Sequence, residues 1–509
     1  MVRLTRLLFC GISVFLGVTT GVTAHAQLTI GGSVYEDHPA LALRQHFMPV
    51  AGVTVKLYRD GGDRMPGADD AAAGTATTNK TGVYSFRVDR AGDYWVAVDS
   101  RTIRKADAWA EQTFGPSGAL CASPDGDVRA SYFEGPCFGG RSNASDDATA
   151  LMTSEHVAGV TLRDAATEVD FAFSFDVVTS TDDGERIQGS LRQYLLNANA
   201  IEGPNRMRFV PMRRAPEQRE TTMGVPPRWW SILIASPLPE VRDADTVIDG
   251  TAYNFLSPAS IANVHPGRIG EPATMRLEER QITRQEKPEL ELVVSGTAGL
   301  TCTATCGIRG LALHGAATGI HLRAPARLEH VMVGAAPDGS TVAGGGTGVR
   351  IDSGTTIARN LLVTSQSAAG IYVAAEARID AERLEITRCG EQTTGGGVIL
   401  LSDGSAVRSS LIAANLGAGI VVGATDGSRP ASGNTIDGST ISSNAAGVVI
   451  SPGSSRNVIT RNDIMWNRLG GVTIAPFQTA VPRENRVSAN RFNENGLRPI
   501  VLDVGASDP

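Results

Sequence analysis

The sequence predicts an all-β protein in which an N-terminal β-sandwich is followed by a right-handed parallel β-helix with a short capping helix. Three observations favour this fold class. The 509 residues include 57 glycines but only 5% aromatic residues, and long helical periods are scarce. Towards the N-terminus, short runs alternate between apolar and polar residues, as in strands with one buried face. Beyond residue 300, a glycine-led motif recurs at intervals that suit one coil of a β-helix.

The first 26 residues have the order of a secretory signal peptide. Arg3 and Arg6 precede an apolar run from Leu7 to Val22, and the small-residue stretch Ala24–Ala26 follows it. We expect cleavage after Ala26 and a secreted, periplasmic or cell-surface protein. An uncleaved anchor is the alternative, although the run is short for a membrane span. No later segment is apolar enough to cross a bilayer.

The charge of the chain argues against nucleic acid as a partner. Residues 1–26 contain two arginines and no acidic residue, so cleavage moves the formal net charge from −7 to −9. Nucleic-acid binding depends on clustered Lys and Arg, which a mildly acidic chain of this length does not offer.

Five cysteines remain after cleavage, and in an oxidising compartment pairs are expected. Cys121 and Cys137 lie in one loop rich in Gly, Asp and Ser, so a disulfide between them would close that loop. Cys302 and Cys306 are close enough in sequence to clip a tight turn. Cys389 is left free.

Residues 27–178 are expected to form the sandwich, with the Cys121/Cys137 loop as an insertion. Apolar residues alternate along three stretches, 53–58, 84–88 and 94–98, and turn residues separate them. Strands of this length at this spacing are typical of a β-sandwich.

Four stretches of this region resemble a known family, namely 32–37, 52–58, 77–86 and the late strand 169–173. Their order is similar to the B-type domains of serine-aspartate-repeat adhesins and, more loosely, to the carboxypeptidase regulatory-like fold. The resemblance implies a spacer or grip at a cell surface.

The adhesin domains often bind calcium through an acidic loop after the second of these strands. Here that loop holds Asp60, Asp63, Asp69 and Asp70, at a spacing that departs from the family pattern. Because calcium takes six or more oxygen ligands, a solvated acidic loop is the alternative.

The β-helix is expected over residues 179–509, with an N-terminal cap at about 187–300 and regular coils at about 301–509. Ser190 and Gln193 have the spacing of a capping box, and Leu191, Leu195 and Ala198 would line one face of a short helix. This stretch resembles the first segment of extracellular parallel β-helix proteins, where an amphipathic helix shields the open edge of the first coil.

The regular coils repeat the order glycine, aliphatic, any residue, aliphatic. The repeat begins at seven glycines separated by 29, 22, 27, 22, 28 and 24 residues, namely Gly319, Gly348, Gly370, Gly397, Gly419, Gly447 and Gly471. A leucine-rich repeat would instead show leucines at fixed offsets.

A second repeat places Asn three residues after an apolar residue, at Asn415, Asn444, Asn467 and Asn495. In stacked coils these amides would lie about 4.8 Å apart and bond along the stack. Ser365 and Cys389 take the equivalent place in earlier coils, which explains Cys389 as a small buried residue.

The outward positions of the glycine-led row suggest a binding surface. They are His321, Arg350, Tyr372, Ile399, Val421, Val449 and Thr473. The first three could instead form an ordinary solvated face, whereas apolar side chains on the outside of a β-helix need a cover. The row contains no carboxylate, and Asp352 lies just beyond one strand without an equivalent in neighbouring coils.

Two functions follow from these observations. The first is a non-catalytic exported or surface protein, structural or adhesive, that binds a polysaccharide or another surface protein. The second is a polysaccharide lyase, hydrolase or epimerase. A cluster of three or more carboxylates in one groove would favour this function. The repeat rows offer no positioned acid and base, so we assign no catalytic residue and favour the first. No cofactor is expected apart from calcium.

Overall fold

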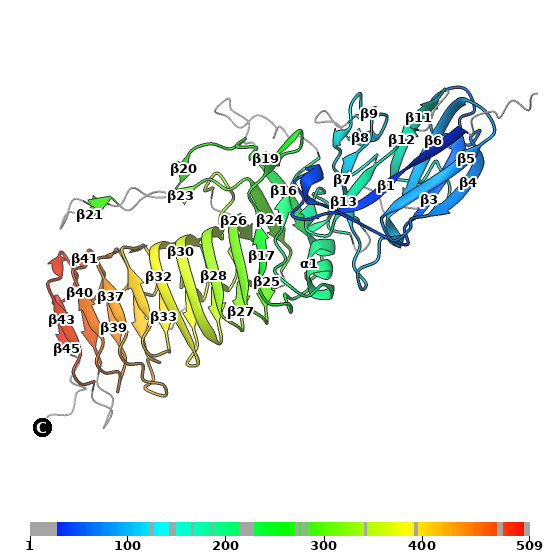
Figure 1. Ribbon diagram of the computed structural model, residues 1–509. Coiled ribbons are helices and arrows are strands. Elements are labelled where there is room, and N and C mark those ends of the chain that lie inside the picture. The colour runs from blue at the N-terminus through cyan, green and yellow to red at the C-terminus, as the bar shows by residue number, and fades with distance from the viewer. Residues whose placement is uncertain are drawn as a thin grey trace, which may run out of the picture.

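Figure 1 shows the computed structural model, in which a two-sheet domain adjoins the first coils of a long stack of parallel strands. The structure describes residues 28–122, 127–141, 149–163, 167–184, 187–212, 229–269, 274–275, 280–281, 285–296, 298–340, 344–390, 395–475 and 482–502. The expected signal peptide lies outside these residues. In the described part of the chain, no helix is both long and apolar enough to cross a membrane.

The N-terminal domain is a β-sandwich, as predicted. One sheet has seven strands, β1 (Leu28–Asp37), β2 (Phe47–Pro49), β5 (Val83–Val88), β7 (Glu111–Gly115), β10 (Gly135–Pro136), β12 (Thr167–Glu168) and β13 (Phe171–Ser174). The other has four, β3 (Thr54–Arg59), β4 (Ala71–Thr77), β6 (Gly92–Asp99) and β11 (His156–Leu162). A hairpin of β8 (Leu120–Ala122) and β9 (Val128–Ala130) and two 3-10 turns, Arg44–His46 and Ser100–Thr102, complete it.

The period-two pattern of the sequence explains the sandwich core. Within one sheet, Val55 and Leu57 of β3 pair with Val98 and Val96 of β6, and all four side chains are buried. The late strand β13 lies parallel to β1, with Phe171 opposite Val34. This pairing closes the domain with the strand that the sequence suggested.

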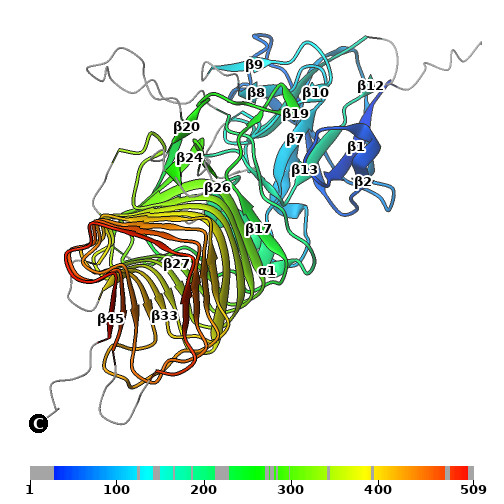
Figure 2. The same cartoon turned by 90° about the vertical axis from the view of Figure 1, so that its left-hand side faces the viewer.

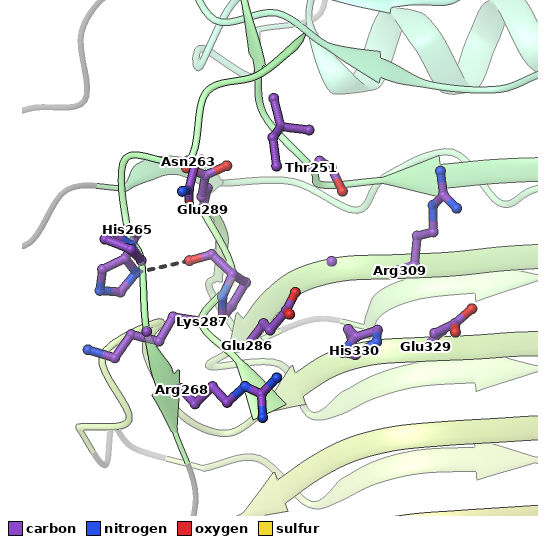
Figure 3. Close-up of a pocket in the computed structure, with 15 residues that line it drawn as sticks. Thr251, Asn263, His265, Arg268, Glu286, Lys287, Glu289, Arg309, Glu329 and His330 are labelled. Atoms are coloured by element: carbon purple, nitrogen blue, oxygen red, sulfur yellow. Dashed lines mark hydrogen bonds between the residues drawn. The ribbon is translucent and has the colours of Figure 1, made fainter. Parts of the chain in front are cut away.

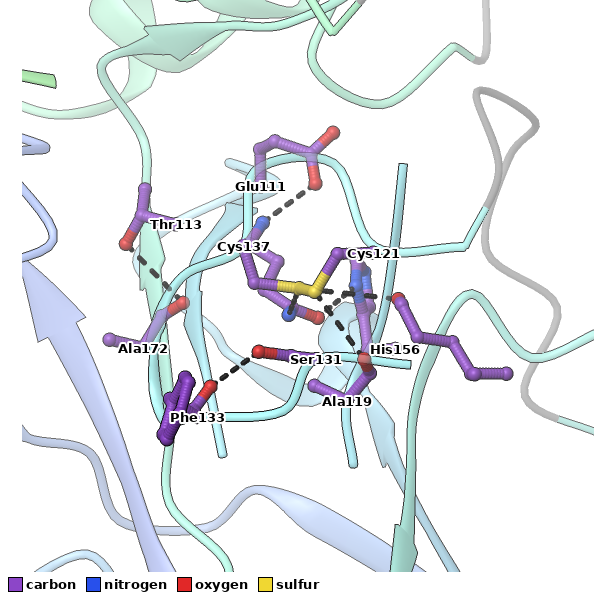
Figure 4. Close-up of a disulfide and its surroundings, with 11 residues drawn as sticks. Glu111, Thr113, Ala119, Cys121, Ser131, Phe133, Cys137, His156 and Ala172 are labelled. Atoms are coloured by element: carbon purple, nitrogen blue, oxygen red, sulfur yellow. Dashed lines mark hydrogen bonds between the residues drawn. A yellow bond between two sulfur atoms is a disulfide. The ribbon is translucent and has the colours of Figure 1, made fainter. Parts of the chain in front are cut away.

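Both expected disulfides are present. The Cα atoms of Cys121 and Cys137 are 5.4 Å apart, and those of Cys302 and Cys306 are 6.4 Å apart. Figure 4 shows the first pair, which ties β8 to the residue after β10. Cys389 is free and buried, as predicted.

Helix α1 (Leu191–Ala200) covers the first coil with its apolar face. Leu191, Leu195 and Ala198 are buried in the β-helix core, as expected. The Ser190 hydroxyl accepts a hydrogen bond from the Gln193 backbone N–H at 3.1 Å, which is half of a capping box. The second hydrogen bond expected of a capping box, between the Gln193 side chain and the Ser190 backbone, is replaced. The Gln193 side chain donates to Asn197 Oδ1.

The β-helix consists of parallel strands in two long sheets (Figure 2). The first holds β16 (Trp230–Ile234), β17 (Thr246–Asp249), β24 (Leu290–Val294), β26 (Cys306–His314), β28 (Ala326–Val333), β30 (Gly354–Thr364), β32 (Ala377–Thr387), β34 (Ala406–Arg408), β35 (Leu411–Ala413), β37 (Thr435–Asp437), β38 (Thr440–Ser442), β40 (Val458–Thr460), β41 (Asp463–Met465), β43 (Arg486–Ser488) and β44 (Arg491–Asn493). The second holds β25 (Ala298–Cys302), β27 (Thr318–Leu322), β29 (Thr347–Ile351), β31 (Ala369–Val373), β33 (Gly396–Leu400), β36 (Ala418–Val422), β39 (Val448–Ile450), β42 (Val472–Ile474) and β45 (Ile500–Leu502).

The glycine-led motif marks the second sheet because coils pass too close there for a side chain. A Cβ added to Gly370 would lie 2.6 Å from the carbonyl oxygen of Gly397, its equivalent in the next coil. The same clash recurs at 2.6 to 2.8 Å for Gly319, Gly348, Gly397 and Gly419. The repeat is thus a packing requirement.

Many bends between strands are formed by residues with positive φ, and in the later coils several of these residues precede a polar ladder residue. Ala414 (φ 55°) precedes Asn415, and Ser443 (φ 57°) precedes Asn444. Asn444 Oδ1 accepts hydrogen bonds from the Asn415 backbone N–H at 3.1 Å and from Asn415 Nδ2 at 2.8 Å. The asparagine ladder is therefore confirmed.

Two further ladders escaped the sequence reasoning, and one assignment was wrong. The additional ladders run through Ser405, Asn434, Asn457 and Asn485, and through Ser410, Ser439, Asn462 and Asn490. Ser365 is not a ladder residue, because it has φ 58° and forms the bend itself. The buried residue after that bend is Gln366.

A segment after β17 leaves the stack and bridges the two domains. It contains the hairpin of β18 (Tyr253–Asn254) and β19 (Ser257–Ile261), and the pair β20 (Arg268–Ile269) and β23 (Gln285–Glu286); β21 (Thr274–Met275) and β22 (Arg280–Gln281) lie between the latter two. Tyr253 and Phe255 pack against a sandwich cluster that includes Phe114 and Phe138. Strand β14 (Val177–Val178) pairs with β15 (Arg208–Phe209), which links the end of the sandwich to the cap.

Candidate functional site

The outward row predicted on the second sheet exists as a row. Strand pairing places His321 beside Arg350, Arg350 beside Tyr372, and Tyr372 beside Ile399. Val421, Val449 and Thr473 continue it in the next three coils.

The polar end of this row is a connected network in which Asp352 has the central place. His321 Nε2 lies 2.7 Å from one oxygen of Asp352, and Arg350 Nε lies 2.9 Å from the other. The Arg350 guanidinium also lies over the Tyr372 ring, 5.0 Å from its centroid. Asp352 has no equivalent carboxylate in the neighbouring coils, but it contacts Arg350 of its own coil and His321 of the coil before it.

The network leaves little free charge. Burial alone would raise the pKa of Asp352, but the hydrogen bond from His321 and the charge of Arg350 lower it. Asp352 is therefore an ionised partner for both groups at neutral pH.

In the apolar part of the row Val421 is buried, and Ile399 and Val449 are half-buried. A binding role for the row stays a prediction.

A second row, on the first sheet, alternates in charge from coil to coil. Paired positions run through Asp249, Arg309, Glu329, Arg359, Glu382, Arg408 and Asp437. This row was not predicted from the sequence, because its strands do not carry the glycine-led motif. The alternation of acidic and basic residues at coil intervals would have been the signal.

Two members of the charged row, Arg309 and Glu329, form part of the floor of a pocket of about 700 Å³. Arg309, Glu329 and His330 lie on β26 and β28, and the segment after β17 faces them across the pocket (Figure 3). That segment contributes His265, Arg268, Glu286, Lys287 and Glu289 to the lining. The segment has no repeat, so the sequence did not indicate it.

Glu289 holds the overhanging segment in place. Its carboxylate accepts a hydrogen bond from the Val264 backbone N–H and is almost fully buried. Burial raises the pKa of Glu289, although the backbone N–H groups around Val264 oppose this shift. Its role is therefore structural as much as chemical.

His265 is held as a neutral imidazole. Its Nδ1 lies 3.1 Å from the Pro288 carbonyl oxygen, which can only accept, so Nδ1 carries a proton. Burial lowers the pKa of His265, so the neutral ring predominates at neutral pH. Its Nε2 is then the acceptor nitrogen in a wall of the pocket.

Arg309 is oriented from behind. Its guanidinium lies 2.5 Å from the buried carboxylate of Asp249, and about half of the Arg309 side chain is exposed. The hydrogen bond to Asp249 raises the pKa of Arg309. A cation fixed in this way presents its remaining donors with little loss of side-chain entropy.

The pocket combines three basic side chains with the carboxylates of Glu286, Glu289 and Glu329, a number that favours the enzyme alternative stated above. The cations are Arg268, Lys287 and Arg309. Among the described residues, no group of three or more His, Cys, Asp or Glu side chains is placed to share a metal ion.

In the sandwich, the acidic loop uses its carboxylates to order its own backbone. Asp60 accepts from the Gly62 N–H at 2.9 Å and from Trp95 Nε1 at 3.0 Å. Asp70 accepts from the N–H groups of Gly61 and Gly67. Calcium binding here stays a prediction, which the melting temperature measured during a calcium titration can check.

These features define a right-handed parallel β-helix protein with a sandwich domain at its N-terminal end. The family described as right handed beta helix region matches residues 334–492. No curated protein matches the chain.

Solved structures with similarity include the A-module of the mannuronan C-5 epimerase AlgE6 of Azotobacter vinelandii, with 13% identity and a TM-score of 0.30 over 54% of this chain and 69% of that one. The periplasmic alginate epimerase AlgG has 12% identity and a TM-score of 0.30 over 53% and 68%. The catalytic domain of a GH87 alpha-1,3-glucanase has 7% identity and a TM-score of 0.26 over 88% and 86%. Values this low say nothing about the chemistry of this chain.

Proposed function

We propose that this is an exported protein that binds an acidic polysaccharide. The binding site would be the pocket between strands β26 and β28 and the segment that follows β17. The observation that carries the proposal is the gathering of Arg268, Lys287 and Arg309 around one concave site of a chain whose formal net charge is −7. Export is supported by the signal-peptide pattern and by the two disulfides, which form in oxidising compartments.

The geometry suits a carboxylated sugar. Arg309 is fixed by Asp249, so its planar guanidinium is ready to donate to a carboxylate. Glu286 and Glu329 line the same pocket as acceptors for sugar hydroxyl groups. Glu289 is buried and holds the backbone, so the groups left to face a ligand are Glu286 and Glu329, together with Arg268, Lys287 and the Asp249-paired Arg309.

Affinity electrophoresis against polyuronates and neutral polysaccharides tests the proposal. The double variant Arg268→Ala/Lys287→Ala removes two of the three cations and spares the Arg309–Asp249 pair. We expect it to lose the retardation by polyuronate, whereas Arg408→Ala should keep it. Arg408 is the matched control, because it belongs to the same charged row, pairs with Asp380 at 2.7 Å and lies outside the pocket. Equal retardation of all three proteins would reject the pocket as the site.

Turnover of the same polysaccharide is the second candidate. It is favoured by His265, a neutral imidazole in a wall that also contains cations, since abstraction of a proton next to a carboxylate needs such a base. Unsaturated or reducing sugar ends should then appear on incubation and disappear in His265→Gln. Activity should also decrease as the pH is lowered, because His265 then becomes protonated and can no longer act as a base. If no polysaccharide of the panel gives product above background, turnover is rejected and binding is the function that remains.

A further inference from the structure

Two adjacent aromatic side chains stand out on the surface of the sandwich domain. Tyr132 is 89% exposed and Phe133 is 81% exposed, the highest values among the large hydrophobic residues that the structure describes. They lie between β9 and β10, in the stretch that the Cys121–Cys137 disulfide closes. Exposed large aromatic residues side by side usually have a partner.

The backbone beneath the two rings is tied down from several sides. The Ser131 carbonyl accepts from the Gly118 N–H, and the Ser131 N–H donates to the Ala119 carbonyl, both at 2.8 Å. The Ser117 hydroxyl donates to the Tyr132 carbonyl at 3.1 Å. Figure 4 shows Ser131 and Phe133 close to the disulfide.

The next residues continue this support. Glu134 forms an ion pair with Arg44 at 2.7 Å, and Gly135 pairs with Gly115 of β7. The two side chains are thus displayed on a fixed backbone, so that a ligand would not have to order the loop.

The size and surroundings of the pair favour a sugar chain over a protein. Two aromatic side chains bury about 300–500 Å², whereas a stable protein interface buries about 800 Å² on each partner. Their immediate neighbours Ser131 and Glu134 are polar. A sugar ring needs one aromatic face and nearby polar groups, which are here the Ser131 hydroxyl oxygen, whose hydrogen is donated to the Phe133 carbonyl, and the Arg44–Glu134 ion pair.

Strands β8 and β9, which precede the pair, lie on the same side of the molecule as β19 and β20, which contribute Ile261 and Arg268 to the pocket (Figures 1 and 2). Figure 2 shows β8 and β9 close to β19, the second strand of the β18–β19 hairpin. That hairpin begins with Tyr253, which packs against the Phe114 cluster of β7, and it ends with Ile261, which lines the pocket.

We propose that Tyr132 and Phe133 form an outlying subsite on which sugar rings of the same polysaccharide stack, so that a long chain contacts both domains. This inference rests on the proposed function, because the pocket supplies the first contact. It also gives the sandwich a part in binding, in addition to any role as a spacer.

The test compares Tyr132→Ala/Phe133→Ala with the parent protein on long polyuronate and on short oligouronates that fill only the pocket. We expect affinity for the long chain to fall about tenfold, which is what the loss of one or two aromatic contacts gives. Affinity for the short oligomers should not change. Tyr132→Phe/Phe133→Tyr keeps both rings and should bind like the parent, and Met65→Ala, which removes another exposed side chain of the sandwich, is the control.

The outcomes separate this inference from the proposed function. If Tyr132→Ala/Phe133→Ala binds the long chain like the parent while Arg268→Ala/Lys287→Ala does not, the subsite is refuted and the pocket stands. If the aromatic variant loses binding and the pocket variant keeps it, the aromatic pair is the site and the proposed pocket is refuted. If both variants bind like the parent, both proposals fail.

Discussion

Replacing Asn444 by alanine should destabilise the β-helix strongly. Asn444 is buried, and its side chain takes part in four hydrogen bonds across three coils. Its Oδ1 accepts twice from Asn415, and its Nδ2 donates to the Ile412 carbonyl at 3.0 Å and to Asn467 Oδ1 at 3.1 Å. At about 1 kcal/mol for each net hydrogen bond, the loss amounts to about 3–4 kcal/mol, less whatever water entering the gap restores.

Two companion variants make this prediction specific. Asn444→Ser should recover part of the loss, because Ser410 and Ser439 accept the same kind of bond in a neighbouring ladder. Asn493→Ala is the matched control, since its side chain forms an exposed hydrogen bond with the neighbouring Glu494. The free energy of unfolding is measured by urea denaturation, with the slope checked for each variant. If Asn444→Ala and Asn493→Ala unfold at the same urea concentration, the ladder does not stabilise the fold.

Three further predictions concern packing, burial and pH. Gly370→Ala should cost about 1–3 kcal/mol of unfolding free energy because of its close approach to the next coil, whereas Gly135→Ala, with open space around it, should cost much less; equal losses in denaturation would refute the packing argument. Cys389, whose pKa burial raises to about 12, should resist a thiol reagent in the native protein and react on unfolding, and prompt labelling would contradict its burial. The lowered pKa of Asp352 stabilises the fold above its unfolded value of about 3.9, and this contribution is lost as the pH falls through that region; Asp352→Asn should therefore be less stable than the parent at neutral pH and lose the difference in acid, and a difference that persists in acid would rule this out.

The parts of the fold that could be predicted are those that every coil repeats. Gly370 and its equivalents recur because each coil meets the next at the same distance, so spacing alone located the second sheet. Asn444 and its equivalents recur because each bend leaves the same buried backbone groups to satisfy. The spacing did not identify the ladder residue correctly at Ser365. The bend residue Ser365 and the buried residue after it, Gln366, are adjacent and both polar, so the sequence alone does not distinguish them.

The pocket could not be predicted because half of it lies outside the repeat. His265 and Lys287 belong to the overhanging segment, and only folding brings them opposite Arg309 and Glu329. The charged row was readable in principle, but its strands do not begin with the glycine motif. Likewise, Tyr132 and Phe133 carry no sequence pattern, and their significance depends on the exposure of both rings above a fixed backbone.

The measurement that tests the account most directly is amide hydrogen exchange followed by mass spectrometry, with and without a saturating oligouronate. We predict slower exchange in the segments that line the pocket, 261–268, 286–289, 309–310 and 329–330. Peptides from β27, β29 and β31, which contain the row of His321, Arg350 and Tyr372, should not change. Slower exchange confined to that row, or no change anywhere, would contradict the assignment of the pocket as the polysaccharide site.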